Sequence, residues 1–210
     1  ISYQNVMDWF KGNFKLFLIL EIVCLLVAGI YFLVTPRIYE ANFSISLPKV
    51  PNLSPGNPQA SKMRLLISPQ EFIRPAQDPM AYSADFVQGC MGEDTNAGRK
   101  QFINALQLGV KQQGDVIAFT LRLAGKQRTQ NCANLLLSKV LGDLTLTHEN
   151  YLKSTGLAVD ENVVKPGLLQ HVRMSDSYVK PDLIKIMTTG FLAGVFLSVF
   201  LSIMRKRYSA

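Results

Sequence analysis

The side chains that most often perform chemistry in proteins are few in this chain and widely spaced. There are two histidines, His148 and His171, and three cysteines, at positions 24, 90 and 132. Zinc sites need pairs of Cys or His a few residues apart, and no such pair occurs. Neither a nucleophile elbow nor a glycine-rich phosphate loop is present. We therefore expect no enzyme activity, no catalytic residue, no metal site and no cofactor.

Cys90 and Cys132 are the two cysteines outside the apolar ends of the chain. In a domain displayed outside the cytoplasm they could meet and form a disulfide, because disulfides persist in oxidising compartments. The alternative is two buried thiols that act as small apolar side chains. The sequence leaves both interpretations open. Cys24 lies inside an apolar run and is expected to be unpaired.

Two apolar runs of 19 residues, Leu16–Val34 and Ile186–Met204, stand at the two ends of the chain. Each would make a helix of about 28 Å, close to the thickness of a bilayer's hydrocarbon core. Basic residues flank both runs on their outer sides, and the positive-inside rule then places both termini in the cytoplasm. A cleaved signal peptide is a poor alternative for the first run, since its apolar region would be only about 7–15 residues long.

The expected organisation is therefore a membrane-anchored hairpin. Its parts are a cytoplasmic segment (1–15), a transmembrane helix (16–35), a periplasmic domain (36–182), a second transmembrane helix (183–204) and a cytoplasmic tail (205–210). The domain holds 16 Lys and Arg against 13 Asp and Glu, a net charge of +3 out of the chain's +7. The basic pI thus owes more to the membrane flanks than to a nucleic-acid surface, and we expect no nucleic-acid partner.

Small side chains recur every four residues along the second apolar run. Such a stripe lets another helix approach closely, which drives helix association in lipid. The partner is either the first span of the same chain, around Ala28 and Gly29, or a neighbouring protomer. The alternative is that small residues are simply common in membrane helices. The stripe consists of Gly190, Gly194, Ser198 and Ser202.

Glu21 is the one charged residue inside the first run. An ionised carboxylate near the middle of a bilayer costs about 2.5–3.5 kcal/mol, so it should face protein or reach the interface. We expect it to pair with Arg205 or Lys206, which this topology places at the same leaflet. The alternative is that its carboxylate extends to the cytoplasmic headgroups.

Between the spans, the hydrophobic pattern predicts an α+β domain, with a small sheet packed against helices. Strict alternation predicts strands at 39–47 and 116–124, which we expect side by side. Apolar residues at three- and four-residue spacing predict one long helix over 127–151. Shorter helices are predicted from the capping signals Ser68-Pro69 and Asp78-Pro79, the second running to Met91, and from the amphipathic stretch 96–111. The proline-rich stretch 48–58 is expected to be an extended or mobile loop, and 157–181 a return segment, with a short strand at Val163-Val164 as an option.

Three segments, in this order and spacing, resemble the Wzz-type chain-length determinants, the polysaccharide co-polymerases of bacterial inner membranes. The first segment is TPRIYEANFSISL (35–47), directly after the first span. The second is GDVIAFTLRLAGKQRTQNCANLLLSKVLGDL (114–144). The third, reached through Lys180-Pro181, is GFLAGVFLSVFLSIMRKR (190–207).

The resemblance implies a protein that is not an enzyme. It implies a homo-oligomeric ring that engages a polysaccharide polymerase in the same membrane and regulates the length of a lipid-linked surface glycan. It leaves open whether the growing glycan is also a partner of the domain itself. Typical members extend the long helix into a tall membrane-distal projection. Here Gly156 and Pro166 follow the helix at once, so this chain resembles a short form. The alternative is a two-span adaptor or sensor of a polysaccharide export or secretion complex, with no effect on glycan length.

Overall fold

The chain consists of two compact units, residues 1–37 with 180–210 and residues 38–179. The computed structural model describes residues 3–51, 63–111, 114–155 and 164–208, without the side chains of 3–11, 13 and 205–208. The predicted strand at Val163 and the predicted helix end at Gly156 lie outside these ranges.

The first unit is a pair of packed helices, α1 (Tyr3–Val34) and α6 (Leu183–Tyr208). Both contain a stretch long and apolar enough to cross a membrane, Phe14–Val34 in α1 and Leu183–Met204 in α6. The two expected spans are therefore helices. The helix α1 also continues through the segment that we expected to precede the span. The backbone N–H of residue 184 donates to Asp182 Oδ1 (3.1 Å), which caps the start of α6.

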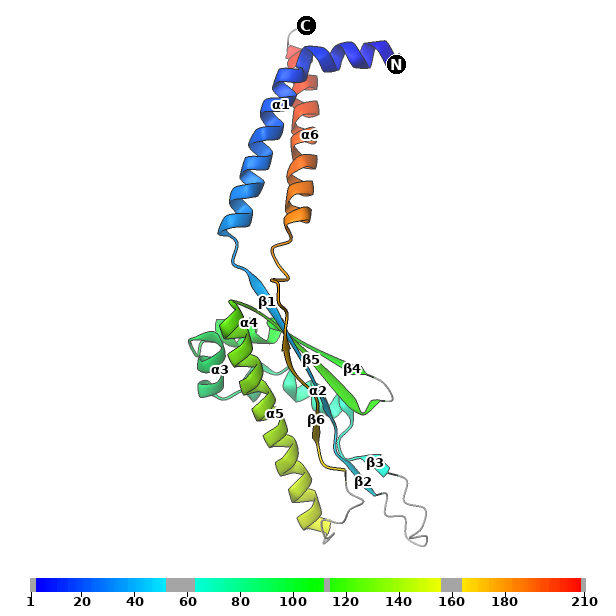
Figure 1. Ribbon diagram of the computed structural model, residues 1–210, viewed down its shortest axis with the longest axis vertical. Coiled ribbons are helices and arrows are strands. Elements are labelled where there is room, and N and C mark those ends of the chain that lie inside the picture. Colours follow the sequence, from blue (N-terminus) through cyan, green and yellow to red (C-terminus); the bar gives the residue numbers. More distant parts are fainter. Residues whose placement is uncertain (1–2, 52–62, 112–113, 156–163, 209–210) are drawn as a thin grey trace. The chain divides into compact units, whose positions relative to one another are not determined.

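The second unit is built on a four-stranded antiparallel sheet with the order β4-β5-β1-β6 (Figure 1). The predicted strands at 39–47 and 116–124 are confirmed as neighbours, because β1 (Ile38–Ser46) pairs with β5 (Val116–Ala124) along its whole length. Phe43 and Phe119 lie opposite each other in this register, and their rings stack with centroids 4.5 Å apart. The α+β class predicted from the sequence is confirmed.

The core lies between one face of this sheet and the helices, of which α5 (Lys126–Thr155) is the longest in the domain. The prediction of a long helix over 127–151 is confirmed, with a few more residues at its end. In Figure 1 the helix α5 runs along the sheet. Its buried apolar side chains recur at three- and four-residue spacing, as the pattern required. They are Cys132, Ala133, Leu136, Val140, Leu144 and Leu152.

The opposite face of the two central strands carries polar side chains that bond to one another. Glu40 accepts hydrogen bonds from Asn42 (2.8 Å) and from the Arg122 guanidinium (2.7 Å). The hydroxyl of Thr120 donates to the amide oxygen of Asn42 (2.6 Å). The bonds from Asn42 and Arg122 hold the pKa of Glu40 below its ordinary value. Alternation along β1 and β5 therefore separates an apolar core face from a polar outer face.

The capping signal at Ser68 is confirmed. The helix α2 (Pro69–Ala76) starts with a capping box, in which Glu71 N–H donates to Ser68 Oγ (3.2 Å) and Ser68 N–H donates to Glu71 Oε2 (2.9 Å). The signal at Asp78-Pro79 is only partly right. It starts a single 3-10 turn, η1 (Pro79–Ala81), and a separate helix α3 (Ala84–Met91) begins after it.

The break between η1 and α3 has a local cause. Tyr82 has extended backbone angles and a buried ring, and the next residue, Ser83, accepts from the N–H of Phe86 as the N-cap of α3. Burying the Tyr82 ring against Phe86 and Phe102 thus interrupts the helix that the pattern predicted.

The predicted helix over 96–111 is wrong in its second half. The helix α4 (Asn96–Ala105) is followed directly by β4 (Leu106–Lys111), which pairs with β5. Leu106 and Val110 fit both a helical face and an alternating strand pattern, because they are four residues apart. Pairing with β5 decides between the two, because it satisfies the backbone groups and extends the sheet.

The proline-rich stretch, expected to be a loop, and the return segment both contain strands. The return segment includes β6 (Gly167–Met174), an edge strand that pairs with β1, and places His171 on this strand with its side chain exposed. The proline-rich stretch begins with β2 (Lys49–Pro51), which pairs with β3 (Met63–Leu65). Val164 forms a single bridge to Lys49.

His148, expected to be an ordinary polar position near the end of its helix, is a buried residue of α5. Its side chain is 2% exposed, and its Nε2 has no hydrogen-bond partner among the described residues. Loss of hydration lowers the pKa of His148, the charge of Lys165 lowers it further, and that of Glu149 opposes the shift. Folding therefore favours the neutral form of the imidazole.

Burial of His148 predicts that the folded protein loses stability at acidic pH. A depressed pKa in the folded state contributes stability above the unfolded value of about 6.5, and that stability is lost as the pH falls below it. We expect a lower urea midpoint at pH 5.5 than at pH 7.5, and a smaller difference in the His148→Phe variant. The exposed His171 supplies the control, since His171→Gln should keep the full pH dependence. Equal pH dependence in all three proteins would contradict the prediction.

Candidate functional site

The stripe of small residues on α6 packs against α1 of the same chain. A Cβ added at Gly190 would lie 2.8 Å from Ala28 Cβ and 3.3 Å from the carbonyl oxygen of Cys24. Further along the stripe, Ser198 and Ser202 are only 1% and 4% exposed. Of the two partners considered for the stripe, the first span of the same chain is therefore the one that occupies it.

Of the two residues proposed on the α1 side, one contacts α6 and the other does not. Ala28 is buried and meets Gly190, whereas Gly29 has no atom within 4 Å of an added Cβ and is not part of the contact. The two residues are adjacent and lie 100° apart around the helix, so only one of them can face α6. Cys24 carries a free thiol, as expected.

Glu21 lies at the centre of the same interface. An added Cβ at Gly194 would be 3.2 Å from Glu21 Cα and would overlap its carboxylate. Both carboxylate oxygens are buried, and neither has a hydrogen-bond partner among the described residues. Gly194 thus provides the space that the Glu21 side chain occupies.

The expected ion pair of Glu21 with Arg205 or Lys206 stays a prediction, because the side chains at 205 and 206 are outside the described part of the chain. The backbone spacing argues against it. Residue 205 follows Gly194 by eleven helical positions, about 16 Å along the axis. Glu21 is at the level of Gly194.

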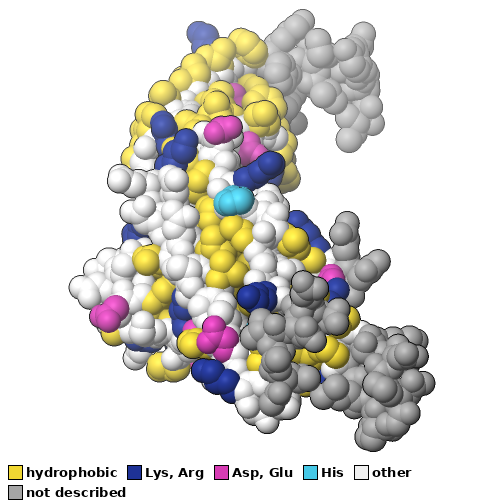
Figure 2. All heavy atoms as spheres, turned by 60° about the horizontal axis from the view of Figure 1, so that its bottom comes forward, with side chains coloured by type: hydrophobic (Ala, Val, Ile, Leu, Met, Phe, Trp, Pro, Cys, Tyr) yellow, Lys and Arg dark blue, Asp and Glu magenta, His cyan; other side chains and the backbone are white. Residues whose placement is uncertain are grey.

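The surfaces of α1 and α6 away from their contact are apolar and exposed. Figure 2 shows hydrophobic side chains gathered on the helical unit. A large apolar surface of this kind needs lipid or protein to cover it. The most exposed of these side chains are Ile19, Leu26, Val27, Leu33, Val34, Ile184 and Phe196.

In the domain, Cys90 and Cys132 are joined by a disulfide, with their Cα atoms 4.7 Å apart. This is the first of the two alternatives that the sequence left open. The bridge ties the last turn of α3 to α5, and both cysteines are fully buried. Arg128, also on α5, strengthens the junction, because its guanidinium donates to the carbonyl oxygens of Cys90 (2.8 Å) and Met91 at the end of α3.

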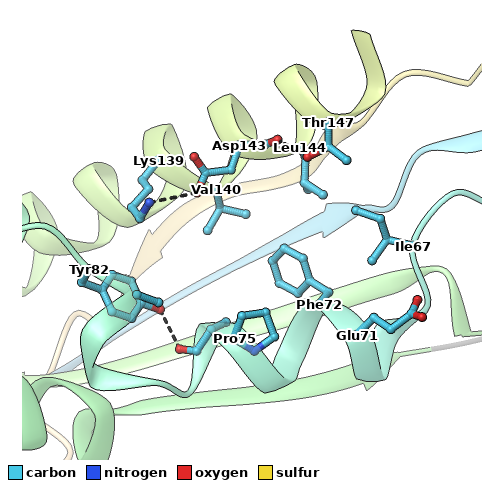
Figure 3. A pocket seen from close by; sticks show the side chains of 12 residues that line it. Ile67, Glu71, Phe72, Pro75, Tyr82, Lys139, Val140, Asp143, Leu144 and Thr147 are labelled. Atoms are coloured by element: carbon cyan, nitrogen blue, oxygen red, sulfur yellow. Dashed lines mark hydrogen bonds and ion pairs between the residues drawn. The ribbon is translucent and has the colours of Figure 1, made fainter. Parts of the chain in front are cut away.

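A groove of about 210 Å³ lies on the domain surface between α2, η1 and α5 (Figure 3). Its floor is apolar, and its rim carries two carboxylates, an ammonium group and a hydroxyl. The apolar lining residues are Ile67, Phe72, Pro75, Ala76, Ala81, Tyr82, Val140 and Leu144, and the polar ones are Glu71, Lys139, Asp143 and Thr147.

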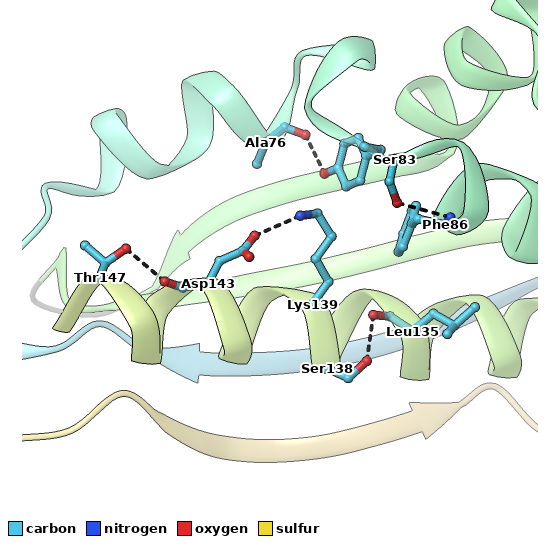
Figure 4. Close-up of polar contacts among 9 residues, drawn as sticks. Ala76, Ser83, Phe86, Leu135, Ser138, Lys139, Asp143 and Thr147 are labelled. Atoms are coloured by element: carbon cyan, nitrogen blue, oxygen red, sulfur yellow. Dashed lines mark hydrogen bonds and ion pairs between the residues drawn. The ribbon is translucent and has the colours of Figure 1, made fainter. Parts of the chain in front are cut away.

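Hydrogen bonds fix the side chains around the groove (Figure 4). The hydroxyl of Tyr82 donates to the carbonyl oxygen of Ala76 (2.7 Å), which ties η1 to the end of α2. On α5, Lys139 and Asp143 form an ion pair one turn apart (2.9 Å), and Thr147 donates to the backbone oxygen of Asp143 (2.8 Å). Burial, with the negative charge of Asp143, raises the pKa of Tyr82 to about 12.

Sequence reasoning missed this groove. Its residues come from three segments, 67–76, 81–82 and 139–147, and no short motif joins them. One signal was available, the Lys139–Asp143 pair on the polar face of the predicted long helix. That pair alone is the ordinary pattern of a solvated helix face.

Among the described residues, no group of three or more His, Cys, Asp and Glu side chains is placed to hold a metal ion. A comparison with protein-family models finds no match for the chain, and a comparison with curated proteins finds none either.

Proposed function

We propose that the protein is a polysaccharide co-polymerase of the bacterial inner membrane. In this proposal it regulates the length of a lipid-linked surface glycan, of the O-antigen, enterobacterial common antigen or exopolysaccharide type. The observation that carries the proposal is the way in which the two apolar helices connect to one sheet. Three residues separate α1 from β1, β6 leads on to α6, and β1 and β6 are paired neighbours.

Two further observations support the placement of this hairpin. The apolar spans carry basic residues on the outer sides, which favours cytoplasmic termini and a periplasmic domain. The disulfide between Cys90 and Cys132 fits an oxidising compartment such as the periplasm.

In the proposed mechanism the protein acts by assembly and does no bond chemistry itself. Copies of the chain form a ring, and their transmembrane helices hold or contact the polymerase. The exposed apolar faces of α1 and α6 supply surface for such contacts within the membrane. Glycan length is then set by how long the growing lipid-linked chain stays near the polymerase.

Deletion of the gene tests this function directly. We expect the surface glycan, separated on a gel, to lose its preferred length and to become a broad, unregulated ladder. Expression of the wild-type chain should restore the preferred length. An unchanged ladder would contradict the proposal and favour a two-span adaptor or sensor of an export or secretion complex.

Electron microscopy of the purified protein in detergent tests the ring. Particles that contain only a single copy of the chain would contradict ring formation.

A further inference from the structure

The floor of the groove on the domain is a fixed apolar surface. Phe72 is held by an edge-to-face contact with Phe119 of the sheet, with ring centroids 6.1 Å apart. Val140 and Leu144 line the opposite side from α5, and Leu144 belongs to the buried core. A ligand that enters would therefore meet rigid apolar atoms below it (Figure 3).

The rim above this floor has hydrogen-bonding capacity that the protein does not use. A carboxylate has about four acceptor positions and an ammonium group three donors. Glu71 accepts from Ser68 and Asp143 from Lys139, so each carboxylate keeps acceptor positions, and the ammonium group keeps donors. The rim thus offers both acceptors and donors around the apolar floor.

This combination matches the chemistry of one sugar ring. A pyranose presents C–H groups on its faces and hydroxyl groups around its edge, each of which both donates and accepts. An apolar peptide side chain would make no use of the polar rim, and a fully polar ligand would gain nothing from the floor. The volume of about 210 Å³ suits a single ring rather than a longer oligosaccharide.

The charge of the rim restricts the kind of sugar further. Glu71 and Asp143 supply two negative charges against the single positive charge of Lys139. The negative charge of Asp143 also reaches the Tyr82 ring below, where it opposes loss of the phenolic proton. An acidic sugar would therefore be repelled.

We propose that the groove between α2, η1 and α5 binds one uncharged sugar residue. If the proposed function holds, that residue belongs to the glycan whose length the protein regulates. The domain then contacts its glycan directly, by a site on the face of α5 next to η1.

Ligand-observed saturation-transfer NMR on the full chain tests the proposal. The protein is kept in a detergent without a sugar headgroup, so that the detergent cannot occupy the groove. The probes are glucose, galactose, rhamnose, N-acetylglucosamine and glucuronate. We expect at least one neutral sugar to bind and glucuronate to bind about fivefold more weakly than its neutral counterpart, glucose, because charges in a water-exposed groove interact only modestly. Asp143→Asn should reduce that preference.

Ala81→Phe provides the blocking variant. Ala81 is exposed at the groove, so the ring should fill the groove without entering the core. The matched control is Ala97→Phe on α4, another exposed alanine that does not line the groove. Sugar signals should disappear in the first variant and persist in the second, with equal unfolding midpoints showing that both fold. Signals that persist in Ala81→Phe, or no signal from any neutral sugar, would overturn the proposal.

A negative result in the binding experiment and a negative result in the gene deletion lead to different conclusions. If no neutral sugar binds while the deletion abolishes the preferred glycan length, the sugar site is wrong and the proposed function stands. If sugars bind in the groove while the ladder is unchanged, the site stands and length regulation is wrong.

Discussion

Replacement of Cys90 and Cys132 by alanine is expected to lower the free energy of unfolding of the domain by about 4 kcal/mol. The disulfide joins residues 42 positions apart, and closing a loop of this size removes chain entropy from the unfolded state. Without the bridge, the last turn of α3 is held to α5 by apolar contacts and by Arg128. Urea unfolding of the full chain in detergent, followed by circular dichroism, measures the change.

A reducing agent gives an independent test of the same bridge. It should destabilise the wild-type protein by a similar amount and leave the double-alanine variant unaffected. Cys24→Ala is the matched control, because its thiol is free, and it should keep the wild-type stability and the full response to reduction. A loss below about 1 kcal/mol on reduction would show that the bridge contributes little to the stability of the domain.

Gly194→Leu is expected to separate α1 from α6. Even a single Cβ at this position would overlap the Glu21 carboxylate and lie 3.2 Å from Glu21 Cα, so the helix backbones themselves must move apart. Over-packing of this kind costs about 1–3 kcal/mol or more when the backbone must shift. We expect a lower thermal unfolding midpoint in detergent, and the preferred glycan length to be lost in cells.

Gly29→Leu is the matched control for this substitution. It introduces the same side chain on the neighbouring helix, at a glycine where an added Cβ meets nothing within 4 Å. Its midpoint should stay close to that of the wild type. The double variant Gly194→Leu with Glu21→Ala should recover part of the loss, because it removes the overlapping carboxylate. No recovery, or equal damage from both leucine variants, would contradict the proposed packing.

The elements predicted correctly from the sequence are those specified by their own residues. Alternation over nine residues was enough to predict the strand β1. A long run of apolar residues at three- and four-residue spacing was enough to predict the helix α5. The capping box at Ser68 and Glu71 marked the start of α2, because both partners lie within four residues. The stripe at Gly190 and Gly194 likewise indicated a close helix contact before its partner was known.

The elements that the sequence did not predict depend on distant partners. The strand β6 contains His171 and Arg173 among its apolar residues, and it becomes a strand by pairing with β1, more than 100 residues earlier. The strand β4 was predicted as helix, because Leu106 and Val110 also fit a helical face. The groove needs the separate placement of α2, η1 and α5, and η1 ends after one turn because Tyr82 is buried in an extended conformation. Tertiary packing decides each of these cases.

The pairing of β1 with β6 has a mechanical consequence. The strands run in opposite directions, so the start of β1 and the chain leaving β6 are at the same end, where the N–H of Val179 donates to Ile38 O (2.7 Å). A force that pulled the two helices apart would act on the sheet at this end. It would break the hydrogen bonds between β1 and β6 one after another, beginning at this end. The hydrogen bond between Val179 and Ile38 would be the first to break.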